Sequence, residues 1–314
     1  MTKAAAIIAA IAAFAVFPLL TASNYFIGII VSGLLYTVAA AALNLVYGYA
    51  GLLSFAQLGF WGIGGYGAAL TVMRFGGNFW EGLALAGLVP AALAAVIGLP
   101  TLRTGRHAFV IVTLTFALLA DLVARNWVGL TRGALGIPGL PAPVLFGLPL
   151  HTPARFYYIA YAYALLAFGF LHLLGTSRIG QVLKAIKQNE PLTQSQGISP
   201  LPYKLAAFVI GAAITGIAGG IFVFYLKIVD PTILDFYYMQ TFLIIVIIGG
   251  AGSFWGVVAA GLVMVALPEA LRFSDDLRMV IYGVILVVAM LALPMGVAGW
   301  FEARRIAHLR AAAK

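Results

Sequence analysis

The chain has 314 residues, of which 63% are hydrophobic and only 9% are charged. A soluble domain usually carries about a quarter charged residues, so this composition excludes a soluble globular fold and predicts a surface that mostly faces lipid. The absence of cysteine excludes disulfides, thiolate metal sites and thiol nucleophiles. The net charge of +9 comes from basic residues in short loops and at the C-terminus, which is typical of cytoplasmic loops and argues against nucleic acid as a partner.

The first apolar run extends from Ala4 to Leu20 and follows Lys3. Such a run fits either a cleaved signal peptide or a first membrane helix. It is at the long end for a signal-peptide core, and a second apolar span follows directly. We therefore favour a membrane helix here.

Ten apolar segments have about the length needed to cross the hydrocarbon core, which is about 20 residues. They occupy residues 5–22, 26–47, 51–73, 83–101, 107–126, 156–175, 204–227, 238–250, 255–271 and 279–299. The segments 238–250 and 255–271 are short and are divided by glycines, which also fits broken or re-entrant helices. The predicted fold class is an all-α integral membrane protein with about ten transmembrane helices, forming a single transmembrane domain over residues 1–314.

The basic residues predict the orientation of these spans. An even number of crossings places both termini and loop 176–203 on the side where most lysines and arginines fall, and loop 127–155 on the opposite side. By the positive-inside rule, the first side is the cytoplasm.

The two long loops differ in character. Loop 127–155 contains five prolines, which exclude a long helix there. Loop 176–203 has helical spacing from Ile179 to Gln196, interrupted only by Pro191. Its apolar residues Ile179, Val182, Leu183 and Ile186 share one face, and Lys184, Lys187 and Gln188 lie on another. Such an amphipathic helix fits a membrane-surface helix, a simple connection, or a docking element for a partner.

Glycines are dense in two regions from opposite halves of the chain. The first region holds Gly48, Gly51, Gly59, Gly62, Gly64, Gly65 and Gly67, and the second holds Gly249, Gly250, Gly252, Gly256 and Gly261. Paired glycine-interrupted segments in the two halves of a transporter indicate a central pathway. Close helix packing through small residues explains them equally well.

Several kinds of chemistry are missing from the sequence. No ionisable residue falls at the centre of a span, since Asp121, His172 and Glu269 lie near span ends, and this argues against transport driven by an ion gradient. The sequence has no phosphate-binding loop of the Walker type and no catalytic constellation within its spans, and its four histidines are scattered singly. A passive pore or a permease energised by another subunit remains.

A series of motifs resembles the LivM-type permeases, the membrane subunits of branched-chain amino-acid ABC importers. The motifs occupy residues 44–57, 62–66, 109–116, 126–138, 177–180, 184–186, 197–198, 204–205, 248–253, 255–256 and 268–269. Their order and spacing hold over roughly residues 30–300. Each motif alone is weak, and together they are specific.

The resemblance implies a non-catalytic permease subunit of the bacterial inner membrane that needs no cofactor of its own. Its partners would be a second, LivH-like permease, two cytoplasmic ATPase subunits that supply the energy, and an external substrate-binding protein. Branched-chain or other hydrophobic amino acids are the expected substrates, by analogy with the family alone. The alternative is a passive channel for a small polar solute such as urea or a short amide.

Two groups of site residues follow. The expected substrate pathway comprises Asn44, Ser54, Gln57, Gly62, Gly64, Gly249, Gly250 and Gly252. The resemblance places the ATPase-coupling loop at 176–203, with Arg178, Gly180, Lys184, Ile186, Glu190 and Gly197 as its coupling residues. The apolar face of its helix is expected to enter a hydrophobic groove on the ATPase, its basic residues to pair with the ATPase rim, and Gly197 to end the helix in a left-handed conformation.

Overall fold

A computed structural model describes residues 12–19, 23–145 and 148–264, together with residues 284, 287, 288, 296 and 299. Five helical segments within this part are long and apolar enough to cross a membrane. They are α2 (Asn24–Leu43) with its π-helical continuation η1 (Asn44–Tyr49), α4 (Phe79–Thr101), α5 (Arg106–Asn126), α7 (Pro153–Thr176) and α10 (Pro200–Leu226). The all-α membrane fold is confirmed. The predicted number of ten spans stays a prediction, because runs 5–22 and 279–299 lie largely outside the described residues.

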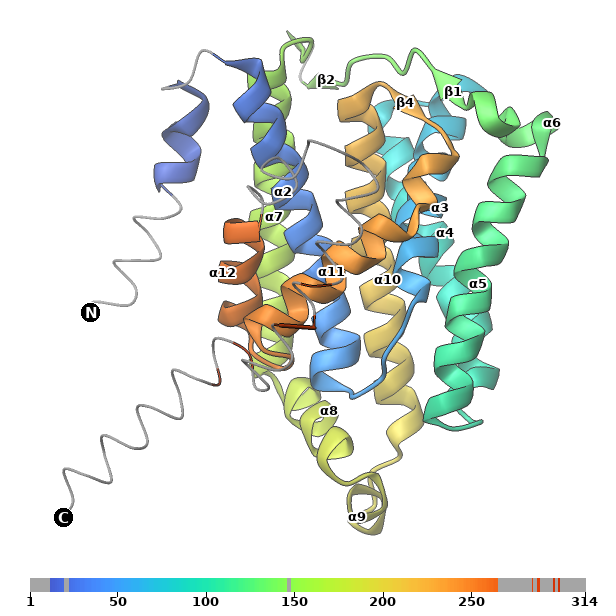
Figure 1. The fold of residues 1–314 in the computed structure, drawn as a ribbon, viewed down its shortest axis with the longest axis vertical. Coiled ribbons are helices and arrows are strands. Elements are labelled where there is room, and N and C mark those ends of the chain that lie inside the picture. Colours follow the sequence, from blue (N-terminus) through green and yellow to red (C-terminus); the bar gives the residue numbers. More distant parts are fainter. Residues whose placement is uncertain are drawn as a thin grey trace.

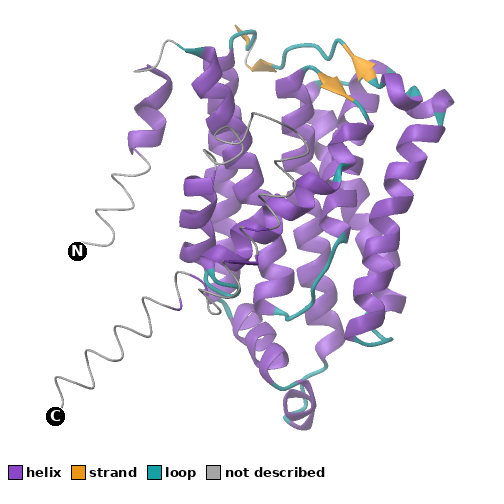
Figure 2. Cartoon of the chain, viewed as in Figure 1, coloured by secondary structure: helices purple, strands orange, loops and turns teal. Residues whose placement is uncertain are grey.

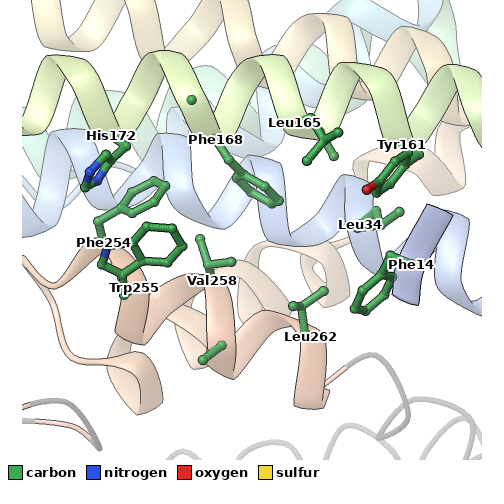
Figure 3. A pocket seen from close by; sticks show the side chains of 13 residues that line it. Phe14, Leu34, Tyr161, Leu165, Phe168, His172, Phe254, Trp255, Val258 and Leu262 are labelled. Carbon is green, nitrogen blue, oxygen red and sulfur yellow. The ribbon is translucent and has the colours of Figure 1, made fainter. Parts of the chain in front are cut away.

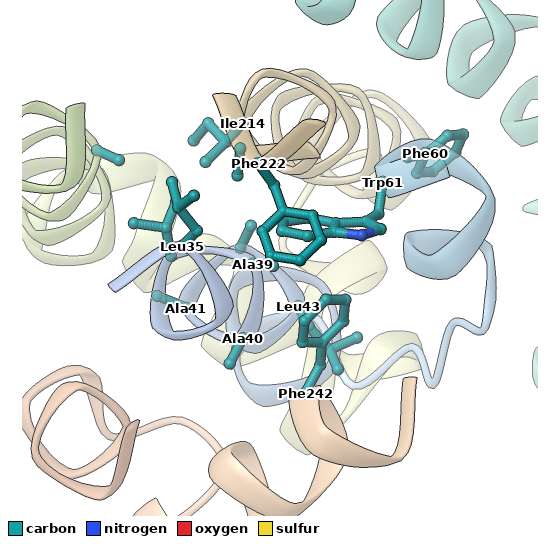
Figure 4. Close-up of a cluster of buried hydrophobic side chains, with 14 of the residues drawn as sticks. Leu35, Ala39, Ala40, Ala41, Leu43, Phe60, Trp61, Ile214, Phe222 and Phe242 are labelled. Carbon is teal, nitrogen blue, oxygen red and sulfur yellow. The ribbon is translucent and has the colours of Figure 1, made fainter. Parts of the chain in front are cut away.

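The long helices stand side by side along the length of the molecule (Figure 1). Three shorter helices complete the described bundle: α3 (Ala56–Met73), α11 (Phe236–Gly249) and α12 (Phe254–Met264). Helix α10 packs most extensively on α3 and α4 and is the most buried of the five candidate spans. Aromatic side chains fill the space between α3, α10 and α11, where Trp61 lies 5.1 Å from Phe222 and 5.6 Å from Phe242 between ring centroids (Figure 4).

Glycines bring α3 and α10 into direct backbone contact. A Cβ on Gly64 would lie 2.2 Å from the carbonyl oxygen of Gly216, and a Cβ on Gly219 would lie 2.1 Å from the carbonyl oxygen of Trp61. No side chain fits at these two points. We call this contact the α3–α10 seam.

Irregular structure gathers at one end of the bundle (Figure 2). It contains α6 (Val128–Thr131), η2 (Gly133–Leu135), η3 (Pro231–Leu234) and two short antiparallel pairs, β1 (Ile137–Pro138) with β4 (Ile228–Val229) and β2 (Val144–Leu145) with β3 (Leu148–Pro149). In the first pair Ile137 faces Val229. As the prolines predicted, loop 127–155 contains no long helix in its described part.

The opposite end carries α8 (Arg178–Gln188) and α9 (Glu190–Ser195), which project below the long helices (Figure 1). The two long loops therefore lie at opposite ends of the bundle, as the distribution of basic residues predicted. The predicted helix from Ile179 to Gln196 is instead two helices. The chain is extended at Asn189, whose side chain caps α9 by accepting a hydrogen bond from the backbone N–H of Leu192 at 3.0 Å.

Candidate functional site

The first glycine-dense region contains a broken helix. Helix α2 widens into the π-helical turn η1, and the chain then runs without helical structure from residue 50 to residue 55 before α3 begins at Ala56. The helix predicted over residues 51–73 therefore begins only at Ala56. Gly51 adopts a φ of +71°, and the Ser54 hydroxyl accepts from the backbone N–H of Ala56 at 3.3 Å. Ser54 is fully buried. Non-helical backbone inside a membrane must be shielded from lipid, either by protein or by a water-filled cavity, and here protein surrounds Ser54.

The second glycine-dense region contains the other break. Helix α11 ends at Gly249 and α12 begins at Phe254. Between them Gly250 has a φ of +95° and Gly252 a φ of +101°, which side-chain-bearing residues rarely adopt. The glycines predicted to interrupt this pair of segments therefore end α11 and set the direction in which α12 leaves.

The two breaks lie against each other, although more than 200 positions separate them along the sequence. The Asn44 side chain accepts a hydrogen bond from the backbone N–H of Gly252 at 2.8 Å and donates to the carbonyl of Ser253 at 3.4 Å. Asn44 is buried, and a Cβ on Gly48 would lie 2.4 Å from the nitrogen of Gly252. We call residues 44–51 with residues 249–253 the glycine junction. It unites four of the predicted pathway residues, Asn44, Gly249, Gly250 and Gly252.

Gln57 lies beside this junction in the first turn of α3. It is fully buried, and neither its amide nitrogen nor its amide oxygen has a hydrogen-bond partner in the described part of the chain. A Cβ on Gly211 of α10 would lie 3.0 Å from the Gln57 amide nitrogen and 3.1 Å from a methyl group of Val46. The amide is thus enclosed between α10 and η1. A buried polar group without a partner costs about 1–3 kcal/mol.

The remaining two pathway glycines have different surroundings. A Cβ on Gly62 would lie 2.3 Å from a methyl group of Leu234, and Gly64 contacts the backbone of Gly216 in the α3–α10 seam. Both contacts are those of packing residues, which was the alternative explanation of the glycine-dense regions. A pathway role for Gly62 and Gly64 receives no support from these contacts.

Helix α8 packs its apolar face onto the rest of the chain. Leu183 and Ile186 are fully buried, and a Cβ on Gly180 would lie 2.4 Å from the carbonyl oxygen of Gly175. Leu183 and Ile186 therefore cannot enter a groove on a partner, which corrects the expectation for these two residues. The sequence reveals that a helix has an apolar face, but not which surface covers it. The exposed face of α8 carries Arg178, Gln181, Lys184 and Gln188, together with Ile179, which is 39% exposed.

The two lysines of α8 both reach η1. The Lys184 ammonium lies 4.7 Å from the centre of the Tyr49 ring, and the Lys187 ammonium donates to the carbonyl of Gly48 at 2.7 Å. Lys187 was expected to face the ATPase rim, and its contact with Gly48 corrects that expectation. No sequence signal distinguished Lys187 from Lys184.

Helix α9 is tied to the start of α10 by an ion pair. Glu190 accepts from Lys204 at 2.5 Å, and the Lys204 side chain is only 6% exposed. Glu190 therefore has a partner within the chain. Gly197 follows α9 with a φ of +80°, which confirms the left-handed conformation predicted for it.

An apolar hollow lies elsewhere, between α2, α7 and α12 (Figure 3). Its volume is about 430 Å³, and its walls are aliphatic and aromatic apart from Tyr161 and His172. It offers no carboxylate, lysine or arginine to the charged ends of an amino acid. Nor does any group of three His, Cys, Asp or Glu side chains gather as metal ligands among the described residues.

Comparison with known proteins identifies the family. The family described as "Branched-chain amino acid transport system / permease component" matches residues 25–290. The chain is 32% identical over 286 residues to the high-affinity branched-chain amino acid transport system permease protein LivM of Salmonella typhimurium, covering 84% of this chain and 67% of that protein. The corresponding LivM of Escherichia coli is 31% identical with the same coverage.

A second type of permease is also similar. The protein LivH of Salmonella typhimurium is 25% identical over 294 residues, which cover 87% of this chain and 94% of that one. No solved structure matches the chain significantly. The resemblance found in the motifs is confirmed: the chain belongs to the permease components of branched-chain amino acid transport systems, which are non-catalytic, multi-pass proteins of the inner membrane.

Proposed function

We propose that the chain forms half of the translocation pathway of an ATP-driven importer for branched-chain amino acids. The observation that carries the proposal is the pair of helices α8 and α9 at the end of the bundle predicted to be cytoplasmic. These helices combine an exposed polar face with contacts to the glycine junction. A simple channel has no need of such an element, whereas a permease energised from outside needs a surface that a partner can move.

The proposed partners are a second, LivH-like permease, two cytoplasmic ATPase subunits and an external substrate-binding protein. The similarity of the chain to both LivM and LivH supports a pore built from two related permeases. The absence of a Walker-type loop from the sequence supports separate ATPase subunits. In this proposal the exposed Arg178, Lys184 and Gln188 meet the ATPase, while Gly180, Ile186, Glu190 and Gly197 hold the docking helices in place.

We further propose that the pathway passes the glycine junction and that Gln57 serves it. A fully buried amide without a partner is unfavourable in the described conformation. An opening of the junction would let water or the polar ends of the amino acid satisfy it. Irregular backbone at Gly249 to Gly252 and at residues 50–55 would supply further polar groups beside it.

Reconstitution separates this function from a passive channel. The chain, its partner permease, the two ATPases and the binding protein would be placed in proteoliposomes with radiolabelled leucine. We expect leucine uptake against its gradient only with ATP and binding protein. Uptake of urea or acetamide by the chain without ATP would establish the channel instead.

The proposed role of Gln57 predicts opposite changes in stability and in leucine uptake when its amide is removed. Gln57→Met removes the unpaired amide at similar volume, so it should raise stability by about 1 kcal/mol while lowering ATP-driven leucine uptake. Thr71→Val serves as the control, since Thr71 lies on the same helix and already donates to the carbonyl of Gly67 at 2.7 Å. Gln57→Met with full uptake would remove Gln57 from the pathway.

A further inference from the structure

The side chain of Lys187 connects α8 with both halves of the glycine junction. Its ammonium donates to the carbonyl of Gly48 at 2.7 Å. A Cβ on Gly51 would lie 2.9 Å from the Lys187 Cγ, and a Cβ on Gly252 would lie 3.7 Å from the Lys187 Nζ. The lysine stem therefore crosses Gly51, and its charged end lies beside both Gly48 and Gly252.

This placement is an unusual use of a lysine on an amphipathic helix. A surface lysine normally keeps its ammonium in water and only lays its stem on apolar surface. Here partial burial lowers the pKa of Lys187. The hydrogen bond joins a cation to the carboxyl-terminal end of η1, where the helix dipole and the free carbonyl groups favour a positive charge.

Helix α8, which carries Lys187, is itself firmly packed against the rest of the chain. Leu183 and Ile186 on the same helix are fully buried, and the helix begins with Ser177 capping the backbone N–H of Gly180 at 3.5 Å. A shift of α8 therefore either carries Lys187 away from Gly48 or moves η1 with it. The Asn44 hydrogen bond to Gly252 passes the same displacement on to the loop between α11 and α12.

We infer that Lys187 is the positioning residue through which α8 controls the glycine junction. In this conformation its ammonium binds η1 at Gly48 and lies beside Gly252, and an ATPase-driven movement of α8 either withdraws it or pulls η1 away from Gly252, so that the two broken helices part. The inference rests on the proposed function, because it requires that a partner moves α8. It assigns to Lys187 a role inside the chain in addition to any contact with the ATPase.

Lys187→Met tests the inference, because methionine keeps much of the stem and removes the charged donor. In the reconstituted complex we would measure both leucine uptake and the rate of ATP hydrolysis stimulated by loaded binding protein. The coupling of two sites typically changes an equilibrium 5- to 150-fold, so we expect leucine uptake per ATP to fall about tenfold, with ATP hydrolysis within about twofold of wild type. Lys187→Arg, which restores a charged donor, should recover part of the ratio.

The matched control is Lys227→Met, the same change at an exposed lysine that lies outside α8 and α9, at the opposite end of the bundle. It should leave both rates unchanged. An unchanged ratio in an assembled Lys187→Met complex would overturn the inference, and so would a parallel loss of both rates in that complex, because a purely structural lysine predicts that result. If Lys187→Met does not assemble, Lys187→Gln, a neutral donor of shorter reach, must assemble and lower the ratio. A wild-type complex without ATP-driven uptake would refute the proposed function instead.

Discussion

The α3–α10 seam and the glycine junction are both built from glycine, yet they use it for different physical reasons. In the seam, Gly64 and Gly216 have helical backbones and are needed because another backbone occupies the place of a side chain. In the junction, Gly48 also makes room for another backbone, but Gly250 and Gly252 are needed because their φ angles are +95° and +101°. The seam joins two intact helices, and the junction joins two broken ones.

This difference implies different mechanical behaviour. Direct backbone contact at two points, Gly64 with Gly216 and Gly219 with Trp61, gives a seam that resists deformation, because closely packed interiors cannot deform gradually under strain. The two breaks of the junction are joined by the hydrogen bonds of Asn44, and Lys187 ties one of these breaks to α8. We therefore expect substitutions in the seam to act on folding and substitutions in the junction to act mainly on transport.

The largest expected effect is that of Gly64→Val in the seam. A Cβ there lies 2.2 Å from the carbonyl oxygen of Gly216, and neither backbone can yield without separating the helices. We expect a loss of about 3 kcal/mol or more and little assembled complex. Expression level and size-exclusion chromatography in detergent would measure it.

Gly67→Val is the control for that substitution. Gly67 lies on the same helix, and a Cβ there meets only the Leu85 carbonyl oxygen at 3.9 Å. It should assemble normally. If both variants assemble alike and Gly64→Val fails only in transport, Gly64 belongs to the pathway and the seam is not rigid.

A smaller effect is expected for Gly252→Ala in the junction. Alanine would have to adopt the positive φ of Gly252, and its Cβ would lie 3.0 Å from the carbonyl oxygen of Gly48. We expect the stability to fall by about 2 kcal/mol. We expect the complex to assemble and leucine uptake to fall severalfold, because the variant pushes the two breaks apart.

Gly76→Ala separates backbone strain from contact. Gly76 has a φ of +68°, but nothing lies within 4 Å of its Cβ position. It should lose a similar amount of stability, about 1–2 kcal/mol, with normal uptake. Equal uptake in the two variants would show that the junction does not take part in transport.

Much of the bundle could be predicted from sequence, since hydrophobic length and basic loops depend on the lipid environment rather than on tertiary contacts. The spans 107–126 and 156–175 agree with α5 and α7 to within three residues. The start of α3 could not be predicted, because the apolar run through Leu52 and Leu53 continues where the backbone stops being helical. Hydrophobic composition predicts which segments enter the lipid, but it does not predict the backbone conformation at Gly51.

The site was predicted as a pathway list, which contained both Asn44 and Gly252, and a separate coupling list, without the contacts between their members. Nothing in the sequence places Asn44 against Gly252, because their contact depends on how the two halves of the chain pack. For the same reason, sequence could not separate the packing glycine Gly64 from the junction glycine Gly252. Lys187 was missed because helical periodicity places it on a polar face, while η1 covers that part of α8 in the folded chain.

The smallest expected effect is that of Asn44→Ala, which removes one link of the junction and leaves every φ angle unchanged. The substitution leaves the backbone N–H of Gly252 without its acceptor at 2.8 Å, and the cost should be about 1 kcal/mol. Because Lys187 still holds Gly48, we expect the junction to loosen rather than open. ATP hydrolysis without loaded binding protein should therefore rise modestly, with leucine uptake reduced less than in Gly252→Ala.

Asn126→Ala provides the control, since Asn126 is exposed and bonds only within its own helix, to the carbonyl of Leu122 at 2.8 Å. A loss in Asn44→Ala as large as that in Gly64→Val would mean that Asn44 supports the fold itself, and the contrast between seam and junction would fail.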